Sequence, residues 1–312
     1  MGKVRKITVF ILGIVCVVLL KSCAQEVKKP EYFFLSGEYQ KIPYTMAEPS
    51  EKFELKSELR EISGLTYYRK KRLLCVNDEK GIVYEYSLKK GEVKKRYKFA
   101  KSGDYEGIEL VDSVLYVLRS DGKLYAVRNF NNEEIEVWDY RTPLKARNDT
   151  EGLGYNPVSG ELLIACKSRP GINNQYVGNR TVYAFHPDKQ QLDTVPRVVI
   201  NLEQIRKVLK YTGYAKISVK LLKSVNPIEG DITFQPSAVS VHPLTGNIYL
   251  LGSVGKLLMV LNPEGQLLAI VRLDRKIFKQ PEGVCFAPDG TMYISNEGKG
   301  GKAKILEFKY LR

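Results

Sequence analysis

The sequence predicts an all-β protein, a β-propeller of five blades, with six blades as the alternative and one short inserted helix. Two observations carry this prediction. A short motif returns at intervals near 45 residues, and each copy is followed by further runs of alternating aliphatic and aromatic residues bounded by Gly, Asn, Asp and Pro. Such runs are typical of strands, and a period near 45 residues with strand-like content is typical of a propeller blade.

Each repeat begins with a segment that we align by its first residue. The five segments are EISGL from Glu61, EGIEL from Glu106, EGLGY from Glu151, SAVSV from Ser237 and EGVCF from Glu282. Three of the four intervals are 45 residues long, and the interval between Glu151 and Ser237 is 86 residues. The equal spacing predicts that the first residues occupy one position in every blade.

Two more strand-like runs follow each of these segments. The second runs are RLLCVN (72–77), VLYVLR (114–119), ELLIACK (161–167), NIYLLG (247–252) and TMYISN (291–296). The third runs are IVYEYSL (82–88), KLYAVR (123–128), TVYAFH (181–186), KLLMVLN (256–262) and KILEFKY (304–310). Successive antiparallel strands of this length form the sheet of one blade.

The long interval contains the exception. We expect residues 181–200 to complete the third blade and residues 202–211 (LEQIRKVLKY) to form the inserted helix, because apolar residues recur there at helical spacing. A loop to Asp231 would follow. A degenerate sixth blade is the alternative, but four strands hardly fit between Asn201 and Phe234.

The two ends of the propeller are predicted to meet. The last repeat leaves room for only three strands before Arg312, so the fourth strand should come from the N-terminal side, near residues 53–59. That closure removes an open sheet edge. The expected organisation is therefore a signal at 1–22, a tether and lead-in at 23–50, and a propeller at 51–312.

The first 22 residues resemble the export signal of a bacterial lipoprotein. A positive start precedes an apolar run at 7–20, which at 14 residues is shorter than the ~20 residues of a spanning helix. Leu20-Lys21-Ser22-Cys23 then matches a lipobox, except that Lys21 replaces the usual small residue. We expect Cys23 to be lipidated and to hold the protein on the cell-envelope membrane, facing the periplasm or the cell surface. An uncleaved anchor helix is the alternative.

Composition narrows the partners. Removing residues 1–22 removes four lysines and arginines and no acid, so the charge falls from +14 to +10. Because the basic residues are scattered through turns, the charge indicates a solvated surface near anionic lipid or glycan, and no nucleic acid. Cys75, Cys166 and Cys285 lie within apolar stretches, which predicts small buried side chains and neither disulfides nor metal ligands.

A ring of carboxylates is the main candidate site. In a propeller the first strand starts, and the second strand ends, at the same face. Glu61, Glu106, Glu151 and Glu282 should therefore converge on one end of the channel, with Ser237 in the fourth blade. Like charges this close need protons or a cation, and Ca²⁺ accepts irregular sets of oxygens. The alternative is that each Glu is a structural latch to the neighbouring blade.

The ends of the second strands should complete this face. The residues expected there as a ligand-binding surface are Asn77, Asp78, Arg119, Asp121, Lys167, Asn296 and Glu297. His186 and His242 fall in turns at the opposite end, and no nucleophile elbow, HExxH, P-loop or dinucleotide motif is present. A Ser-His-Asp hydrolase and a histidine-rich zinc site are therefore not expected.

The repeat motifs carry a resemblance to a known family. EISGLTY, DYEGIEL, DTEGLGYNP, QPSAVSVHP and QPEGVCFAPDG, spread over residues 55–312, resemble the SdiA-regulated (YjiK) family of exported β-propeller proteins. The family is similar, more distantly, to phytase-like and esterase-like propellers. The resemblance implies a propeller with bound Ca²⁺ and assigns no activity. Ser237 departs from the acidic pattern, so a ring of five carboxylates is not expected.

Two functions follow from these observations. The first is a membrane-anchored module that binds a small molecule, glycan or protein on the Glu face, with Ca²⁺ at the channel mouth. The second is a Ca²⁺-dependent hydrolase of the phytase-like or lactonase-like kind, in which Arg119 or Lys167 would hold an anion and a Glu would act as base. A purely structural envelope protein is a third reading.

Overall fold

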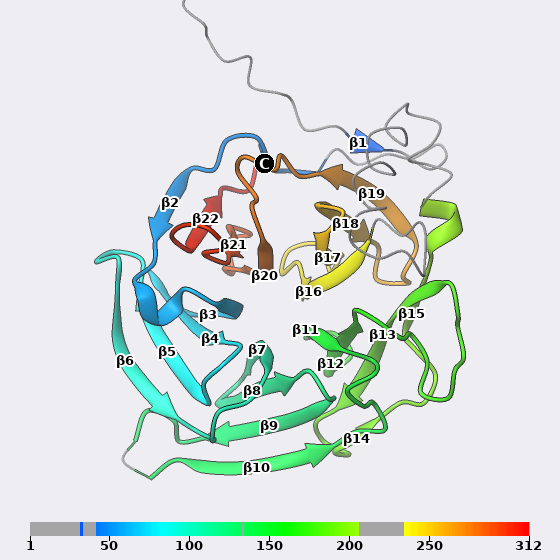
Figure 1. The fold of residues 1–312 in the computed structure, drawn as a ribbon, viewed down its shortest axis with the longest axis horizontal. Coiled ribbons are helices and arrows are strands. Elements are labelled where there is room, and N and C mark those ends of the chain that lie inside the picture. The colour runs from blue at the N-terminus through cyan, green and yellow to red at the C-terminus, as the bar shows by residue number, and fades with distance from the viewer. Residues whose placement is uncertain (1–31, 34–41, 133, 206–233, 312) are drawn as a thin grey trace, which may run out of the picture.

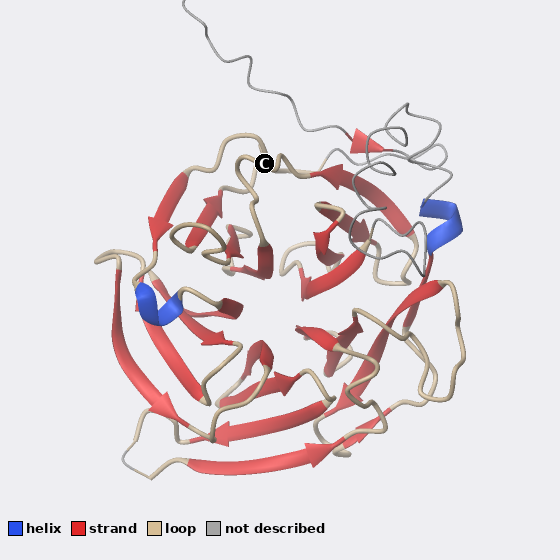
Figure 2. Cartoon of the chain, viewed as in Figure 1, coloured by secondary structure: helices blue, strands red, loops and turns tan. Residues whose placement is uncertain are grey.

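The computed structural model describes residues 32–33, 42–132, 134–205 and 234–311. They form five antiparallel sheets arranged in a ring around a central channel (Figure 1). Almost all of the regular structure is strand (Figure 2). The fold is therefore an all-β propeller of five blades, as the repeat predicts.

In each blade the first three strands run outward from the channel in chain order, and each pairs with the next one. Blade 1 contains β3 (Ile62–Arg69), β4 (Arg72–Asn77), β5 (Ile82–Ser87) and β6 (Glu92–Lys98). Blade 2 contains β7 (Tyr105–Val111), β8 (Val114–Arg119), β9 (Lys123–Arg128) and β10 (Glu136–Arg141). Blade 3 contains β11 (Thr150–Asn156), β12 (Glu161–Cys166), β13 (Asn179–His186), β14 (Gln191–Leu192) and β15 (Val198–Asn201).

The last two blades take strands from the N-terminal side. Blade 4 contains β16 (Gln235–Val241), β17 (Ile248–Val254), β18 (Leu257–Leu261) and β19 (Leu267–Arg272), with β1 (Tyr32–Phe33) paired on its outer edge. Blade 5 contains β20 (Pro281–Phe286), β21 (Met292–Asn296), β22 (Lys304–Phe308) and β2 (Glu51–Glu54). Blade 5 is thus closed by an N-terminal strand, as predicted. That strand is shorter than expected, because residues 57–59 form the 3-10 helix η1 (Ser57–Leu59).

The inserted helix begins where the sequence predicts. Residues 202–205 are helical, and Leu202 and Ile205 are buried against blades 3 and 4. Residues 206–211 of the predicted helix, the predicted signal at 1–22 and the predicted lipidation site at Cys23 all lie outside the described residues.

The hydrophobic core of the described residues consists of five clusters, one between each pair of neighbouring blades. Alternation along a strand produces this division. In β4, for example, Leu73 and Cys75 face blade 5, whereas Leu74 and Val76 face blade 2. The cysteines at 75, 166 and 285 are free and buried in these clusters, which confirms the predicted role as small hydrophobic side chains. Burial raises the pKa of the Cys166 thiol to about 12.

Part of the lead-in belongs to the propeller. Ile42, Tyr44 and Met46 are buried in the cluster between blades 4 and 5. The Tyr44 hydroxyl donates to the carbonyl of Gly290 at 2.6 Å and lies 2.8 Å from Nε2 of His242. The tether therefore ends before Ile42, and the chain enters the domain beside the turns of blades 4 and 5.

Candidate functional site

The same backbone irregularity marks the start of the innermost strand in every blade. The ladder between the first and second strands shifts register there, leaving one or two residues out of the pairing. A β-bulge of this kind re-aims a side chain and is common next to functional sites. In each blade one bulged residue comes directly before a small residue, which packs against the next blade. From blade 1 to blade 5 these bulged residues are Ser63, Glu106, Glu151, Ser237 and Glu282.

This geometry corrects the alignment of the first blade. Glu61 does not occupy the position of Glu106, because Ile62 pairs with Asn77 in the way that Tyr105 pairs with Arg119. Ser63 takes that position instead. Because side chains alternate along a strand, a shift of two residues keeps Glu61 on the same side but moves it one step toward the mouth.

Equivalent backbone hydrogen bonds in four blades confirm this shift of two residues and define a second tier of the site. In four blades the N–H at the end of the second strand donates to the carbonyl of the residue two positions before the bulge. These pairs are Asp78 to Glu61, Ser120 to Asp104, Lys167 to Asp149 and Glu297 to Gln280. The site therefore has an inner tier at the bulges and an outer tier at the mouth, to which Glu61 belongs.

The two serines of the inner tier act as latches between blades. Ser63 Oγ donates to the carbonyl of Tyr105 at 2.6 Å, and Ser237 Oγ donates to the carbonyl of Pro281 at 2.9 Å. These acceptors are equivalent residues of the following blades. The latch role that the sequence left open for the Glu residues is thus filled by the serines, and the three inner glutamates line the channel.

The glycines after the bulges serve packing between blades. A Cβ on Gly64 would lie 3.0 Å from Cα of Gly107, and a Cβ on Gly152 would lie 2.8 Å from the backbone nitrogen of Val239. The inner strands approach each other too closely for a side chain at these positions. Close packing of the strands therefore places the inner glutamates around a narrow channel.

These residues enclose a polar cavity of about 130 Å³ at the channel mouth, which we call the carboxylate well. It is lined by Glu61, Ile62, Ser63, Asp78, Glu106, Glu151, Lys167, Gln280, Glu282 and Glu297. Six of these ten residues are acidic and one is basic. All four glutamates predicted to converge are present, together with Asp78, Lys167 and Glu297 from the predicted binding face.

Burial without sufficient positive charge dominates the electrostatics of the well. Burial raises the pKa of Glu106 to about 10, with further contributions from Glu151 and Asp104. Burial also raises the pKa of Glu282. Because each unneutralised carboxylate makes ionisation of the next one harder, the well favours protons or an added cation.

Lys167 supplies an internal cation. Its ammonium group donates a hydrogen bond to Oε1 of Glu151 and lies 4.0 Å from Oδ2 of Asp149. Burial raises the pKa of Glu151 to about 8 despite the opposing effect of Lys167. Burial disfavours the charged ammonium, but Glu151 raises the pKa of Lys167 above its usual value. One lysine therefore neutralises one side of the well.

Two acids at the mouth of the well have pKa values that are raised toward neutral pH. Burial, followed by Glu61, raises the pKa of Asp78 to about 6. Burial, followed by Glu61, also raises the pKa of Glu297 to about 7, and Gln280 donates a hydrogen bond to Glu297. Among the described residues, Oδ1 of Asp78 is buried without a hydrogen-bond partner. Such an atom is costly unless a proton or cation satisfies it.

Four residues of the predicted binding face lie outside the well. Asn77 is buried and shapes the following turn, accepting a bond from the Lys80 N–H at 2.9 Å. Arg119 is paired with Asp121, with Nε 2.9 Å from Oδ1. Asn296 is buried and does not line the cavity.

Sequence reasoning missed three lining residues, namely Ile62, Ser63 and Gln280. A signal for two of them was present. Aligning the repeats on Gly64, Gly107, Gly152 and Gly283 would have placed Ser63 with the inner glutamates and Gln280 with Glu61. Nothing in the pattern of Ile62 distinguishes it from a core residue.

The histidines lie at the other end of the propeller, as predicted. His242 is buried, its Nδ1 accepts from the Leu244 N–H at 3.3 Å, and burial lowers its pKa to about 4. His186 lies 3.1 Å from Asp193 near the end of β13. Both side chains therefore serve turns on the face opposite the carboxylate well.

The donor chemistry of the well suits a hard cation. Its lining offers carboxylate, amide and hydroxyl oxygens, with no sulfur or imidazole, and Oδ1 of Asp78 has no partner. Yet within the described part of the chain no group of three or more Asp, Glu, His or Cys side chains is already gathered closely enough to hold a metal ion. A cation would therefore have to draw the side chains together.

Comparison with known proteins decides the family. The model of the SdiA-regulated family matches residues 49–299. The chain belongs to this family. The matched range includes all five bulges and therefore the whole of the carboxylate well. No curated protein matches the chain.

The fold of this chain is similar to that of several solved structures. This chain is similar to glutaminyl cyclase from Myxococcus xanthus, with a TM-score of 0.55 and 11% identity over 84% of this chain and 95% of the cyclase. It also resembles a PQQ-bound aldose sugar dehydrogenase from Streptomyces coelicolor, with a TM-score of 0.47 and 12% identity over 84% and 97% of the two chains. At these identities the similarity is one of fold, and the neighbours with this fold include enzymes.

Within the described residues there is no helix that is long and apolar enough to cross a bilayer. The predicted attachment site, Cys23, lies before these residues and stays a prediction.

Proposed function

We propose that this protein is a membrane-anchored binding module whose carboxylate well takes up a cation, with Ca²⁺ as the candidate, and thereby organises one face for a ligand or partner. The observation that carries the proposal is the shortage of positive charge in the well. Six acidic side chains share a cavity of about 130 Å³ with the single ammonium of Lys167. Buried carboxylates so arranged gain from any cation that replaces their protons.

Three acids of the well already have a partner: Lys167 pairs with Glu151, Arg60 with Glu61, and Gln280 donates to Glu297. We expect the other three to hold the ion, namely Glu106 and Glu282 in the inner tier and Asp78 at the mouth. A bound Ca²⁺ would supply positive charge that could also polarise an oxygen atom of a ligand. The chain's own part is to position the oxygens through the five bulges and to keep Glu151 occupied by Lys167.

Binding is favoured over the alternative of a Ca²⁺-dependent hydrolase of the phytase-like or lactonase-like kind. In the form that the sequence suggests, such an enzyme would hold an anionic group of its substrate with Arg119 or Lys167. Arg119 is engaged by Asp121, and Lys167 is engaged by Glu151. Both candidates for that role are therefore neutralised within the fold.

A thermal melting experiment tests the proposal. If Ca²⁺ binds the folded state only, it should stabilise the protein by about 2.7 kcal/mol at a hundredfold excess over Kd, and chelator should reverse the gain. Glu106→Gln should blunt the response, because it removes a ligand charge from the inner tier.

The matched control is Glu264→Gln, an exposed Glu in the turn between β18 and β19 at the opposite end. It should respond to Ca²⁺ as the natural protein does. A melting temperature that ignores Ca²⁺ over the millimolar range, with no ion detected by native mass spectrometry, would contradict the proposal. The glutamates would then be protonated structural groups.

A further inference from the structure

The end of the propeller opposite the carboxylate well presents unusual turns, which we call the turn face. It is formed by the turns that join the first and second strands of each blade and by the turns that follow the third strands. Val158 is 90% exposed in the turn of blade 3, and Leu244 is 53% exposed in the equivalent turn of blade 4. Leu311, 54% exposed, follows blade 5. Three neighbouring blades thus each place an aliphatic side chain in solvent on one face.

These turns are rigid. The N–H of Val158 donates to Oδ1 of Asn156 at 3.0 Å, and the N–H of Leu244 donates to Nδ1 of His242 at 3.3 Å. Gly160 and Gly246 close the two turns with φ values of 72° and 71°. A fixed turn loses little conformational entropy when its tip is buried. The apolar tips are therefore suited to insertion into a second phase.

Residues of other types around the tips match a membrane interface. Tyr310 is half-buried beside Leu244, since both would contact a Cβ added at Gly290. Tyr67 and Tyr155 are half-buried near the ends of β3 and β11. Tyrosines with a buried ring and a wet hydroxyl are enriched at the membrane–water boundary.

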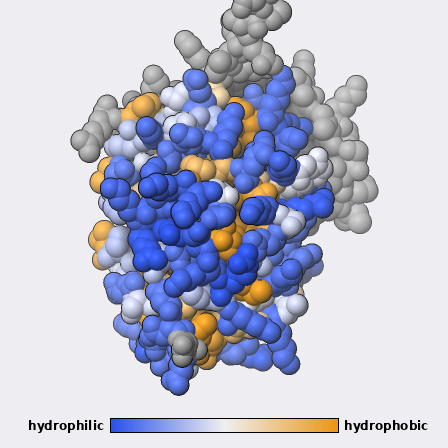
Figure 3. Space-filling model, turned by 90° about the vertical axis from the view of Figure 1, so that its left-hand side faces the viewer, coloured by the Kyte–Doolittle hydropathy of each residue, from blue (hydrophilic) through white to orange (hydrophobic). Residues whose placement is uncertain are grey.

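Positive charge lies on the same face, beside the apolar tips. The turns of blade 1 expose four lysines, and a fifth follows blade 5: Lys70, Lys71, Lys89, Lys90 and Lys309. Lysines near an anionic leaflet are attracted to it. The turns of blades 2 to 5 also expose acids on this face, namely Asp112, Asp188, Glu264 and Asp289. The attraction to an anionic leaflet should therefore be concentrated at blade 1. By contrast, the flank in Figure 3 is mainly hydrophilic with only small apolar areas.

The length of the N-terminal chain permits contact between this face and the membrane that Cys23 would enter. Eight residues lie between Cys23 and Tyr32, which pairs with Val271 in β19. Fully extended, this segment reaches about 30 Å. Because β1 is antiparallel to β19, Tyr32 lies nearer the well end than Phe33, and the segment has to double back over the about 14 Å of strand between Val271 and the turn-face end of β19 at Leu267. Its reach exceeds that distance. The anchor can therefore lie in the plane of the apolar tips.

We propose that the turn face is a lipid-docking surface: Val158, Leu244 and Leu311 insert into the interface of the membrane that holds Cys23, so that the carboxylate well opens away from the lipid. This inference rests on the proposed membrane attachment. It adds an orientation and a contact surface that attachment alone does not require. The well then faces soluble ligands or partners.

Two exposed valines at opposite ends of the molecule allow a matched test. The full lipidated protein is reconstituted in vesicles of phosphatidylcholine and phosphatidylglycerol, carrying Val158→Cys or Val177→Cys. Val177 is 80% exposed in the loop between β12 and β13, on the side of the well. A polarity-sensitive fluorophore is attached to each cysteine. The cysteines at 75, 166 and 285 are buried and should not react.

The label at 158 should shift to the blue and be quenched by a lipid-borne quencher, whereas the label at 177 should do neither. Adding Leu244→Ser should shrink the shift at 158, because it removes a neighbouring apolar tip. If the protein stays on the vesicles but both labels remain in water, or the label at 177 is the one quenched, the docking inference is overturned while attachment stands. If the lipidated protein does not remain on vesicles, the attachment proposal itself fails.

Discussion

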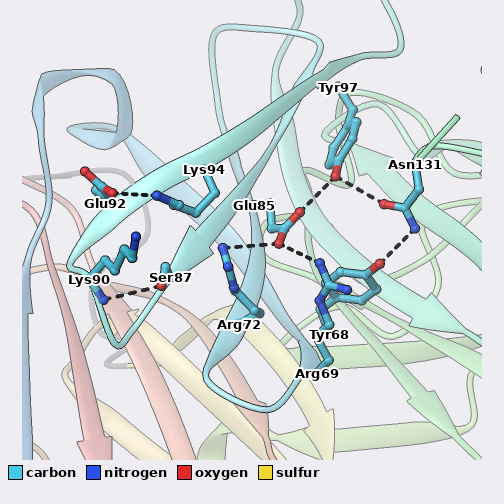
Figure 4. A network of polar contacts seen from close by, with 10 residues as sticks. All are labelled: Tyr68, Arg69, Arg72, Glu85, Ser87, Lys90, Glu92, Lys94, Tyr97 and Asn131. Atoms are coloured by element: carbon cyan, nitrogen blue, oxygen red, sulfur yellow. Dashed lines mark hydrogen bonds and ion pairs between the residues drawn. The ribbon is translucent and has the colours of Figure 1, made fainter. Parts of the chain in front are cut away.

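Two of the regions that hold buried carboxylates treat them in opposite ways. Glu85 in β5 is only 1% exposed. It accepts from Nη2 of Arg69 at 3.0 Å, lies 3.3 Å from Nη1 of Arg72 and accepts from the Tyr97 hydroxyl at 2.9 Å (Figure 4). These partners outweigh the effect of burial, so the pKa of Glu85 lies below its usual value.

The carboxylate well lacks such compensation. Six acids and one lysine line it, Arg60 reaches only Glu61 at the mouth, and burial raises the pKa values of Glu106 and Glu151 to about 10 and about 8. The same fold therefore neutralises a buried acid where the role is structural, as between blades 1 and 2. It leaves acids unneutralised where the inner strands bulge into the channel. The contrast supports the proposal that the well takes up a cation in place of protons.

The largest expected effect comes from breaking the compensated region. Glu85→Gln should lower the free energy of unfolding by about 2–3 kcal/mol, because two arginines and Tyr97 lose an ionised partner. Arg69 is more than half exposed, which keeps the effect below that of a fully buried pair. Chemical denaturation of the variant and the natural protein at neutral pH measures the difference.

Glu106→Gln is the matched control, since it makes the same chemical change in the uncompensated region. It should leave stability unchanged or raise it by about 1 kcal/mol, because the raised pKa makes Glu106 take up a proton on folding at neutral pH, and a neutral amide avoids that cost. Equal losses for Glu85→Gln and Glu106→Gln would contradict the proposed difference between the two regions.

A smaller effect should separate the ion pair inside the well from pairs on the surface. A double-mutant cycle with Glu151→Gln and Lys167→Met should give a coupling energy of about 1–2 kcal/mol, since Glu151 is only 5% exposed. The same cycle on Arg96 and Glu58, whose Nε and Oε2 atoms lie 2.7 Å apart in a largely exposed pair, should give less than about 1 kcal/mol.

If the two coupling energies proved equal, burial of the Lys167 pair would have no energetic consequence. The well could then not be described as a low-dielectric site. Urea titrations at fixed salt supply the seven free energies of unfolding, since both cycles share the natural protein.

The fold was predictable because periodicity reports on packing. Strands that alternate between two neighbouring blades must repeat apolar residues with the blade, and the spacing near 45 residues followed directly. Closure by an N-terminal strand was predictable from the missing fourth strand of blade 5. The end of that strand was not, because residues 57–59 carry no pattern that separates a short 3-10 helix from a strand.

The location of the site was predictable from the sequence, but the predicted alignment of Glu61 with Glu106 was wrong by two residues. Second-strand geometry placed Asp78, Lys167 and Glu297 correctly beside the glutamates. Glu61 was aligned with Glu106 because both are glutamates, whereas the positions that packing fixes are the glycines. Gly64 packs on Gly107, so Ser63 is the true equivalent. A shift of two residues preserves the side of a strand, which is why Glu61 still reaches the mouth.

The compensation of Glu85 could not be read from the sequence. Its partners come from three strands, and Asn131, which accepts from Tyr97 at 3.1 Å, belongs to the next blade. Pairings of this kind depend on which side chains meet across a sheet. The repeat describes backbone positions and contains no information about such side-chain choices.

The smallest expected effect is a difference in pH dependence, and its sign separates the two regions. An acid whose folded pKa is raised contributes stability that is complete below its unfolded pKa, near 4.3, and is lost as pH rises toward the folded value. For Glu151 this loss should extend over about pH 4.5 to 8. Glu85, with a lowered pKa, contributes stability above its unfolded pKa and loses it as pH falls through the folded value.

Glu151→Gln, measured in the Lys167→Met background to avoid a stranded ammonium, should therefore flatten the decline in stability between pH 5 and 8 by about 1 kcal/mol. Glu85→Gln should alter the profile only below about pH 5. The measurement is the free energy of unfolding at each pH.

The pH dependence of the Ca²⁺ effect adds a further check. Because the ion must displace protons from the well, its stabilising effect should grow from pH 6 to pH 8. A calcium effect independent of pH would mean that the ion binds elsewhere than among these raised-pKa carboxylates.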